Sequence, residues 1–331
     1  MTDDINTLIY NLINKLNLGN IIDEPVRVMG GLLNRMYKVN TTSGIYAVKH
    51  LNPEVMKRKN AKENHILAEK IANIAKENNI NCLPAKIING TALQEIDGNY
   101  FFIFDWFQGK AVKENEITLE HIKKVSTLLA KLHNTNFDKV KNECNLGTEN
   151  LEINWDFYIS KVENKEIIDL LINNKEYLTK LDFLSTNARR KISNNLVVSH
   201  RDLDLPNILW NSNNELAIID WESAGLINPT QEFFETAWDW CGWHKDFDIE
   251  KYDLFYKTYQ DNGGLLLDVE KALYADFKAK SSWLEFNLKR LIDNMSKEEF
   301  DVGKKESLRM IKEIFDFYNI FSKIYCFELN I

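Results

Sequence analysis

The chain has 331 residues, 44% of them hydrophobic, which suits about two domains with sizeable cores and argues against disorder. It carries 41 Lys and Arg against 49 Asp and Glu, a net charge of -8, without a long basic run. We therefore expect neither nucleic acid nor an anionic membrane as a partner. The four cysteines form no CxxC pair and no zinc-ligand spacing with histidine, which indicates buried or incidental thiols.

The N-terminal residues carry no basic segment ahead of an apolar stretch, and no apolar run approaches the length of a membrane span. Such a sequence is typical of a cytoplasmic protein. The oligomeric state stays open.

In chain order, the first part of the sequence is rich in strand signals. Apolar residues at helical spacing from Ile5 to Leu16 predict an opening helix, and a second helix is predicted over 61–78. Around these helices, apolar runs bounded by turn residues predict five strands, at 26–29, 36–39, 45–49, 85–88 and 100–104.

After residue 109 the helical pattern dominates. A short apolar strand at 196–199 and a hairpin of 208–210 with 216–219 interrupt the helices. The predicted helices are 119–133, stretches around 155–174 and 178–193, and several from residue 230 onward, the last opened by a capping box of Ser296 and Glu299.

The most informative segment follows the strand at 196–199. It begins with His200-Arg201-Asp202 and ends with Asn207, and Ile219-Asp220 closes the hairpin that comes after it. A carboxylate at Asp202, in a loop on a rigid strand, can orient a substrate hydroxyl and accept its proton. Taken alone, this segment could also be a polar turn after a strand.

Two further side chains offer oxygen ligands for a metal ion. Asn207 and Asp220 lie on opposite sides of one hairpin, and amide and carboxylate oxygens suit Mg²⁺. With Asp202 they match the spacing that phosphoryl transfer from ATP needs. Glu222 could contact a second metal ion through water or could be a plain loop carboxylate.

A lysine at the end of a strand indicates a phosphate contact. Lys49 follows Tyr-Ala-Val, and such a lysine can bind phosphates if a carboxylate fixes it. Glu63 on the next helix is the expected partner and Glu69 the alternative, because residues six apart face different sides of a helix.

Two more segments are candidates for nucleotide binding. Gly30-Gly31 permits a tight turn and close backbone approach to phosphate, although a plain hairpin turn is the alternative. Asp105 and Phe107 lie where the two parts of the chain join, and an adenine could bond to backbone and stack on apolar side chains there.

Together, Ala-Val-Lys49, the segment from His200 to Asn207, and Ile-Asp220 resemble the protein-kinase-like superfamily. The chain is most similar to its aminoglycoside phosphotransferase / choline kinase family. That similarity rests on Gly-Gly-x-x-Asn-Arg at 30–35, Leu-x-x-Leu-His at 129–133, and Asp-Trp-Glu-x-Ala-Gly at 220–225 followed by Asn-Pro at 228–229.

The resemblance implies an α+β, bilobal protein-kinase-like fold with a five-stranded antiparallel N-lobe and a mainly helical C-lobe. We assign residues 1–104 to the N-lobe with the phosphate clamp and 105–109 to a hinge. Residues 110–331 form the C-lobe with the catalytic loop and the acceptor site.

The chain departs from protein kinases in four ways. It lacks Gly-x-Gly-x-x-Gly and Ala-Pro-Glu, and Trp-Glu follows Asp220 instead of Phe-Gly. Asp204 stands where protein kinases usually carry a phosphate-contacting lysine, and a negative charge there is unfavourable unless it points away or binds a cation. The missing parts are those that dock a peptide.

In this family the acceptor lies between the catalytic loop and the C-terminal helices. Carboxylates beside a tryptophan suit a cationic acceptor through ion pairing and cation–π contact, although the same spacing fits a solvated helix face and a core tryptophan. The candidates are Asp204, Glu222, Glu232, Glu235, Trp238 and Asp239.

The sequence thus predicts a phosphotransferase that uses ATP or GTP and Mg²⁺ to phosphorylate a hydroxyl of a small molecule, such as an aminoglycoside or an amino alcohol. One alternative is a nucleotide-binding scaffold or coat-type protein without catalysis. Another is a protein kinase, against which the missing peptide-docking parts argue.

Overall fold

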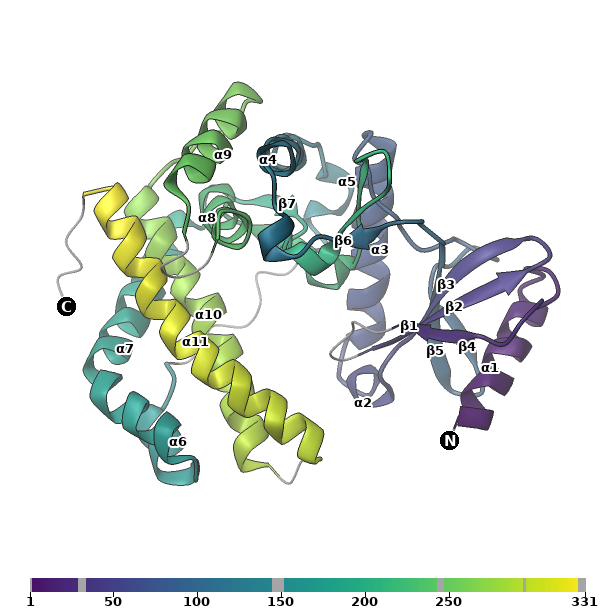
Figure 1. Ribbon diagram of the computed structural model, residues 1–331, viewed down its shortest axis with the longest axis horizontal. Coiled ribbons are helices and arrows are strands. Elements are labelled where there is room, and N and C mark those ends of the chain that lie inside the picture. The colour runs from purple at the N-terminus through teal and green to yellow at the C-terminus, as the bar shows by residue number, and fades with distance from the viewer. Residues whose placement is uncertain (1, 29–33, 145–151, 243–246, 294–295, 327–331) are drawn as a thin grey trace. The chain divides into compact units, whose positions relative to one another are not determined.

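Five antiparallel strands form the main sheet of the N-terminal part, in the order β1-β2-β3-β5-β4 (Figure 1). The computed structural model describes residues 2–28, 34–144, 152–242, 247–293 and 296–326. The strands are β1 (Val26–Val28), β2 (Arg35–Thr41), β3 (Gly44–His50), β4 (Gln94–Ile96) and β5 (Asn99–Asp105). The predicted five-stranded antiparallel sheet is confirmed, with one strand exchanged for another.

The strand predicted at 85–88 does not form, and β4 takes its place at the edge of the sheet. The N–H of Ala85 donates to a side-chain oxygen of Glu69 at 2.6 Å instead of to a neighbouring strand. Residues 85–88 make one backbone hydrogen bond to β5 in the described structure, from Lys86 N–H to the Ile103 carbonyl at 2.7 Å. Because the Glu69 carboxylate already accepts from the Ala85 N–H, that N–H is not available for pairing with a strand.

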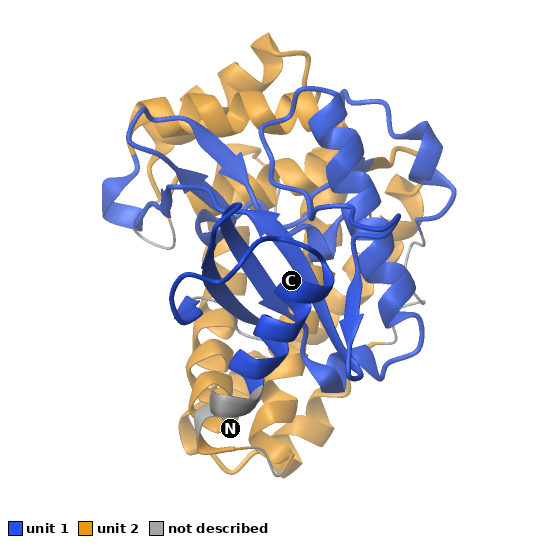
Figure 2. Ribbon diagram, turned by 90° about the vertical axis from the view of Figure 1, so that its right-hand side faces the viewer, with its two compact units in different colours: residues 1–117, 134–145, 198–225 blue, residues 118–133, 146–197, 226–331 orange. Residues whose placement is uncertain are grey.

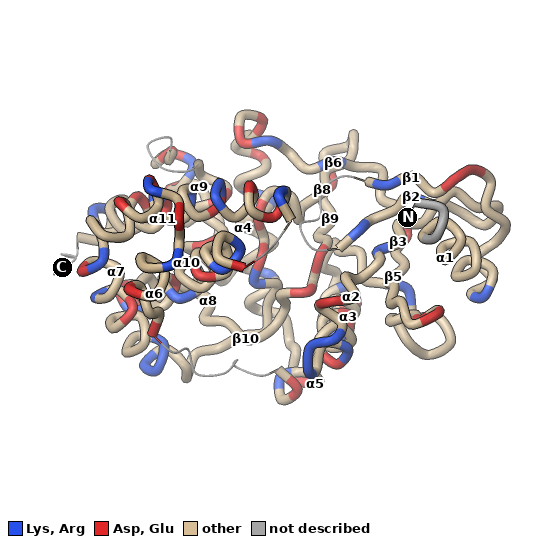
Figure 3. The backbone as a smooth tube through the Cα atoms, turned by 90° about the horizontal axis from the view of Figure 1, so that it is seen from below, with Lys and Arg blue, Asp and Glu red and all other residues tan. Residues whose placement is uncertain are grey.

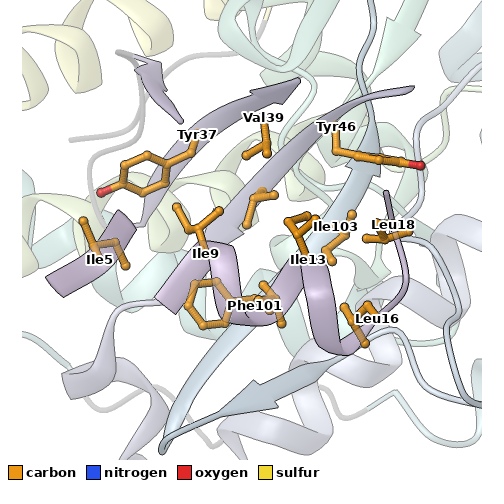
Figure 4. Packing of buried hydrophobic residues seen from close by; sticks show 12 residues of the cluster. Ile5, Ile9, Ile13, Leu16, Leu18, Tyr37, Val39, Tyr46, Phe101 and Ile103 are labelled. Atoms are coloured by element: carbon orange, nitrogen blue, oxygen red, sulfur yellow. The ribbon is translucent and has the colours of Figure 1, made fainter. Parts of the chain in front are cut away.

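Helix α1 (Thr2–Lys15) covers one face of the sheet and builds the core of this part (Figure 4). Ile5, Ile9 and Ile13 recur at every fourth position and point at the strands, as helical periodicity predicts. Phe101 and Ile103 of β5 meet them from the sheet, and both are fully buried.

Short elements complete the N-terminal part. Helices α2 (Pro53–Met56) and α3 (Ala61–Glu77) follow β3, and α5 (Asp138–Lys141) lies beside α3. Strands β6 (Lys110–Ala111), β8 (Ile208–Trp210) and β9 (Leu216–Ile218) form a three-stranded sheet. The turn into β6 needs glycine, because a Cβ on Gly109 would lie 2.8 Å from the carbonyl oxygen of Trp210.

The chain clusters into two compact units (Figure 2). Unit 1 comprises residues 1–117, 134–145 and 198–225, and unit 2 comprises 118–133, 146–197 and 226–331. The segment from His200 to Asp220 therefore packs with the N-terminal strands. The lobe boundary at 105–109 stays a prediction.

Unit 2 is almost entirely helical. Helix α10 packs against α7 on one side and α11 on the other, and α4 packs against α9. Its helices are α4 (Leu119–His133), α6 (Trp155–Lys161), α7 (Lys165–Ile192), α8 (Pro229–Trp240), α9 (Ile249–Asp261), α10 (Val269–Ile292) and α11 (Lys297–Ile324). The unit boundary falls within the short strands β7 (Val197–Ser199) and β10 (Gly225–Ile227).

Two predictions in unit 2 have different outcomes. The capping box of Ser296 and Glu299 at the start of α11 is confirmed. The predicted break between 174 and 178 is wrong, because α7 runs unbroken from Lys165, capped by Asn164, whose side chain accepts from Ile167 N–H at 3.1 Å.

Figure 3 shows acidic and basic positions interspersed along the helices of unit 2. Among the residues described, no helix combines the length and the apolar character that a membrane crossing requires.

The packing of α1 makes a testable prediction. Replacing Ile13, which is fully buried, by Ala should lower the free energy of unfolding by about 2–5 kcal/mol, because a cavity remains under the helix. Tyr10→Ala on the same helix, where the side chain is 37% exposed, should cost no more than about 0.5 kcal/mol. Urea unfolding followed by circular dichroism measures both, and equal losses would contradict this packing.

Candidate active site

The β8–β9 hairpin places the two proposed metal ligands side by side. Ile208 lies opposite Ile218, and the N–H of Ile219 donates to the carbonyl of Asn207 at 3.0 Å. Asn207 therefore enters the hairpin beside Asp220, which leaves it. The antiparallel register brings together two residues at the opposite ends of one hairpin.

Asp202 is held against this pair by an amide. The Asn207 side-chain nitrogen donates to the Asp202 carboxylate and to the Asp202 carbonyl, both at 3.0 Å. His200 is fully buried and its Nε2–H donates to the carbonyl of Ile219 at 3.0 Å. These bonds fix the loop between β7 and β8 to the end of β9.

Two residues of these loops have left-handed backbone conformations. Arg201 has φ 66° and Asp220 has φ 61° and ψ 65°. Residues other than glycine rarely adopt this region, and such strain often marks functional sites. At Asp220 the turn into η3 (Trp221–Ser223) carries the side chain toward Lys49.

Lys49 forms ion pairs with two carboxylates. Its Nζ lies 2.9 Å from an Asp220 oxygen and also contacts Glu222, while only 8% of the lysine side chain is exposed. Burial alone would lower the pKa of Lys49, but the charges of Asp220 and Glu222 outweigh it and raise the pKa. Burial likewise opposes ionisation of Asp220, and the lysine charge overcomes it, so the Asp220 pKa is lowered.

Asp202 has the opposite electrostatic setting. Loss of hydration raises the pKa of its carboxyl, and the neighbouring negative charge of Asp220 adds to this. His200 and the hydrogen bond from Asn207 oppose part of the rise. A carboxylate with a raised pKa is a better proton acceptor than one at its ordinary value.

The structure does not bring Glu63 to Lys49, and this corrects the expected pairing. Glu63 is exposed on α3, whereas Glu69 is buried on the same helix. Helical periodicity separated the two faces correctly, but the carboxylate of Glu69 accepts a hydrogen bond from the N–H of Ala85. The carboxylates that contact Lys49 come from the end of β9 and from η3.

One long-range contact of Glu222 was not predicted from the sequence. The side-chain nitrogen of Asn34 donates to both of its oxygens, at 2.8 and 3.1 Å. Glu222 therefore contacts Asn34 and Lys49, and its role as an acceptor contact stays a prediction. Asn34 belongs to the Gly-Gly-x-x-Asn-Arg motif, but the motif does not indicate which residue Asn34 contacts. Gly30 and Gly31 themselves fall outside the described residues.

Asp105 is the last residue of β5, and Phe107, which is half-buried, follows the strand. Asp105 pairs with Lys86 at 2.7 Å, and its side chain is 64% exposed. The carbonyl of Phe107 accepts from the N–H of Gly109 at 3.0 Å. The adenine contact at these residues stays a prediction.

The site suits a divalent cation that is shared with phosphates. Asn207 uses its nitrogen to bind Asp202, which leaves its amide oxygen as the acceptor for a cation. In the parts of the chain that the structure describes, no three His, Cys, Asp or Glu side chains gather as a metal site. An amide and a carboxylate are a fitting donor set for Mg²⁺ that keeps water and phosphate ligands.

Two of the acceptor candidates in unit 2 have structural partners. Glu232 is 1% exposed, and its carboxylate lies 2.7 Å from Nε2 of His133. The other ring nitrogen of His133 lies 2.7 Å from the hydroxyl of Tyr259, so the three side chains form a closed network. Trp238 is 1% exposed and stacks on Phe247 at 5.6 Å.

Glu235 and Asp239 retain partial exposure on α8. Burial, and then the adjacent Asp276, raise the pKa of Glu235 well above its ordinary value. Asp276 is fully buried, and burial raises the pKa of its carboxyl as well. Asp204, in unit 1, is half-buried, and its carbonyl accepts from Asn207 N–H at 3.2 Å.

Glu69 makes the stability of unit 1 depend on pH. Burial raises its pKa from 4.5 to about 7, so the folded state holds the proton more tightly than the unfolded state. Stability should therefore fall as the pH rises from about 4.5 to 7, by at most about 3 kcal/mol. Glu69→Gln, which still accepts from Ala85, should flatten this part of a stability–pH curve measured with urea; an unchanged slope would contradict the assignment.

Comparisons with known proteins agree with this geometry. The model of the phosphotransferase enzyme family matches residues 25–265. No curated protein sequence matches the chain. Among solved structures, spectinomycin phosphotransferase in complex with ADP and spectinomycin is similar, with 12% identity and a TM-score of 0.73 over 94% of this chain and 98% of that one.

Two further kinases of known structure have a similar fold. Choline kinase from Streptococcus pneumoniae has 15% identity and a TM-score of 0.60, over 94% of this chain and 99% of that one. Plasmodium vivax ethanolamine kinase has 17% identity and a TM-score of 0.58, over 88% and 82%. The family model covers well over half of the sequence, so the chain belongs to the phosphotransferase enzyme family and is a small-molecule kinase.

Proposed function

We propose that the chain transfers the γ-phosphate of ATP, with Mg²⁺, to a hydroxyl group of a small cationic molecule. The observation that carries this proposal is the Asn207 amide, which joins Asp202 to the hairpin end where Asp220 pairs with Lys49. A proton acceptor, two oxygen ligands and a phosphate-binding cation are thereby assembled in one packed unit.

Each of these side chains has a separate role. Asp202 orients the acceptor hydroxyl and takes its proton, and its raised pKa suits this task. Asn207 and Asp220 would hold Mg²⁺, which neutralises charge on the phosphates when it is bound. Lys49 contacts the phosphates with an ammonium group that its neighbours keep charged.

Adenine nucleotides are the proposed phosphate donors rather than GTP. Spectinomycin phosphotransferase was crystallised with ADP and with AMP, and an amicoumacin kinase with AMP-PNP and Ca²⁺. Asp105, Phe107 and the Gly30-Gly31 turn remain the proposed contacts of the nucleotide.

Glu235 and Asp239 are the proposed contacts of the acceptor. Both lie on α8, and both keep exposed surface. The carboxylate of Asp239 can pair with an ammonium group of an amino alcohol or an aminoglycoside. The carboxyl of Glu235, whose pKa is raised, can hydrogen-bond to a hydroxyl or amine group of the same molecule. Glu232 and Trp238 instead hold α8 in place through His133 and Phe247.

A nucleotide-binding scaffold and a protein kinase are the competing functions. A scaffold would bind ATP without phosphorylating any hydroxyl compound in a broad screen. A protein kinase would label protein substrates with ATP. The set of Lys49, Asp202, Asn207 and Asp220 favours catalysis over a scaffold, since a scaffold needs no proton acceptor.

Asp202→Asn tests the mechanism. It removes the proton acceptor but keeps the shape, so kcat should fall by about 100-fold or more while the ATP dissociation constant changes little. Asp97→Asn, in an exposed turn of unit 1, is the matched control and should leave both values unchanged. A steady-state assay and calorimetry measure them, and full activity of Asp202→Asn would refute the mechanism.

Two substitutions on α8 separate binding from packing. Once a thermal-shift screen of amines and aminoglycosides identifies an acceptor, Asp239→Asn should raise the acceptor KM by about tenfold and leave the KM of ATP unchanged. Glu232→Gln should lower stability by about 1–3 kcal/mol through His133 and leave both KM values unchanged. The reverse pattern would place Glu232, not Asp239, at the acceptor.

A further inference from the structure

Lys49 has two carboxylate partners, and they are not equivalent. Asp220 is the proposed metal ligand, and 42% of its side chain is exposed. Glu222 contacts the same ammonium group, and 29% of its side chain is exposed. If a cation binds Asp220, the charge of that carboxylate is shared between the cation and Lys49. The ion pair between Lys49 and Glu222 can then persist while the cation is bound.

Glu222 is fixed in place by a second residue. The side-chain nitrogen of Asn34 donates to its two oxygens at 2.8 and 3.1 Å. The side-chain oxygen of Asn34 in turn accepts from the backbone N–H of Asn52 at 2.8 Å. Both polar atoms of the Asn34 amide are therefore engaged, and its orientation is determined.

This arrangement ties three segments together at the position of Lys49. Asn34 directly precedes β2 and Asn52 directly follows β3. Lys49, near the end of β3, lies opposite Met36 near the start of β2. Glu222 reaches the ends of both strands from η3, so it can hold the lysine without help from a helix.

The glutamates of α3 have other surroundings. Glu63 is exposed, and an oxygen of the buried Glu69 accepts from Ala85 N–H at 2.6 Å. Burial raises the pKa of Glu69 to about 7, and the charge of Lys49 opposes part of that rise. Among the described residues, the carboxylates in ion-pair contact with Lys49 are those of Asp220 and Glu222 and not those of α3.

We propose that Glu222 is the standing partner of Lys49 and that Asn34 holds Glu222 in this role, so that Asp220 is available to a divalent cation. Both are positioning residues, since they act through Lys49. This inference rests on the proposed function, because it assumes that Asp220 binds the cation beside a nucleotide.

The experiment measures how ADP binding depends on Mg²⁺ concentration. Calorimetric ADP titrations are made over a series of MgCl₂ concentrations at constant ionic strength. The midpoint is the Mg²⁺ concentration at which the ADP affinity has made half of its total change. In Glu222→Gln, Lys49 has only Asp220 as a partner and competes with the cation, so the midpoint should rise by about tenfold. Asn34→Ala keeps every charge and should raise the midpoint in the same direction by a smaller factor.

A second background distinguishes positioning from direct metal binding. In Lys49→Met the competing ammonium group is absent, so adding Glu222→Gln should leave the midpoint unchanged. An equal shift in both backgrounds would show that Glu222 binds the cation itself and would overturn the inference. Glu77→Gln, an exposed carboxylate on α3, is the matched control and should not shift the midpoint.

Two further outcomes also decide the matter. A rise in the midpoint for Glu63→Gln or Glu69→Gln, without one for Glu222→Gln, would return the role to α3 and overturn the inference. Melting temperatures of all variants verify that they fold. If Glu222→Gln does not fold, Asn34→Ala supplies the test. A wild-type chain that binds no ADP would instead refute the proposed function, and the role of Glu222 with it.

Discussion

The ion pair between Lys49 and Asp220 is the interaction on which the active site depends. It joins β3 to the end of β9 across 171 residues of sequence, with 2.9 Å between the charged atoms. Because the lysine is buried, its charge would be costly without the two carboxylates beside it. The requirement for a counter-charge therefore favours contact between β3 and the end of the β8–β9 hairpin.

Much of this site could be predicted because it is local. The sequence of the β8–β9 hairpin has two apolar runs joined by a polar turn, which is typical of a hairpin. Its antiparallel register brings Asn207 beside Asp220. Asp202 lies five residues before Asn207, within reach of the amide. The alternation of β2, β3 and β5 likewise specifies three of the five strands, since each has one face on α1.

The errors arise where a residue depends on a partner far away in the sequence. A strand was predicted at Ala85, but its N–H donates a hydrogen bond to the carboxylate of Glu69 and not to a neighbouring strand. Glu232, Glu235 and Asp239 share one helical pattern, and only His133, on α4, shows that Glu232 is a buried hydrogen-bond partner. The Asn34–Glu222 contact spans 188 residues, a distance at which neither periodicity nor spacing gives a signal.

The central claim is that this site moves phosphate from ATP to a hydroxyl group. Phosphorus-31 NMR of the wild-type chain with ATP, Mg²⁺ and pooled amino alcohols and aminoglycosides tests it most directly. The account predicts that the γ-phosphate signal of ATP is replaced by that of a phosphate monoester, with an equal amount of ADP. ATP that stays intact with every pool, or that yields only inorganic phosphate, would contradict it.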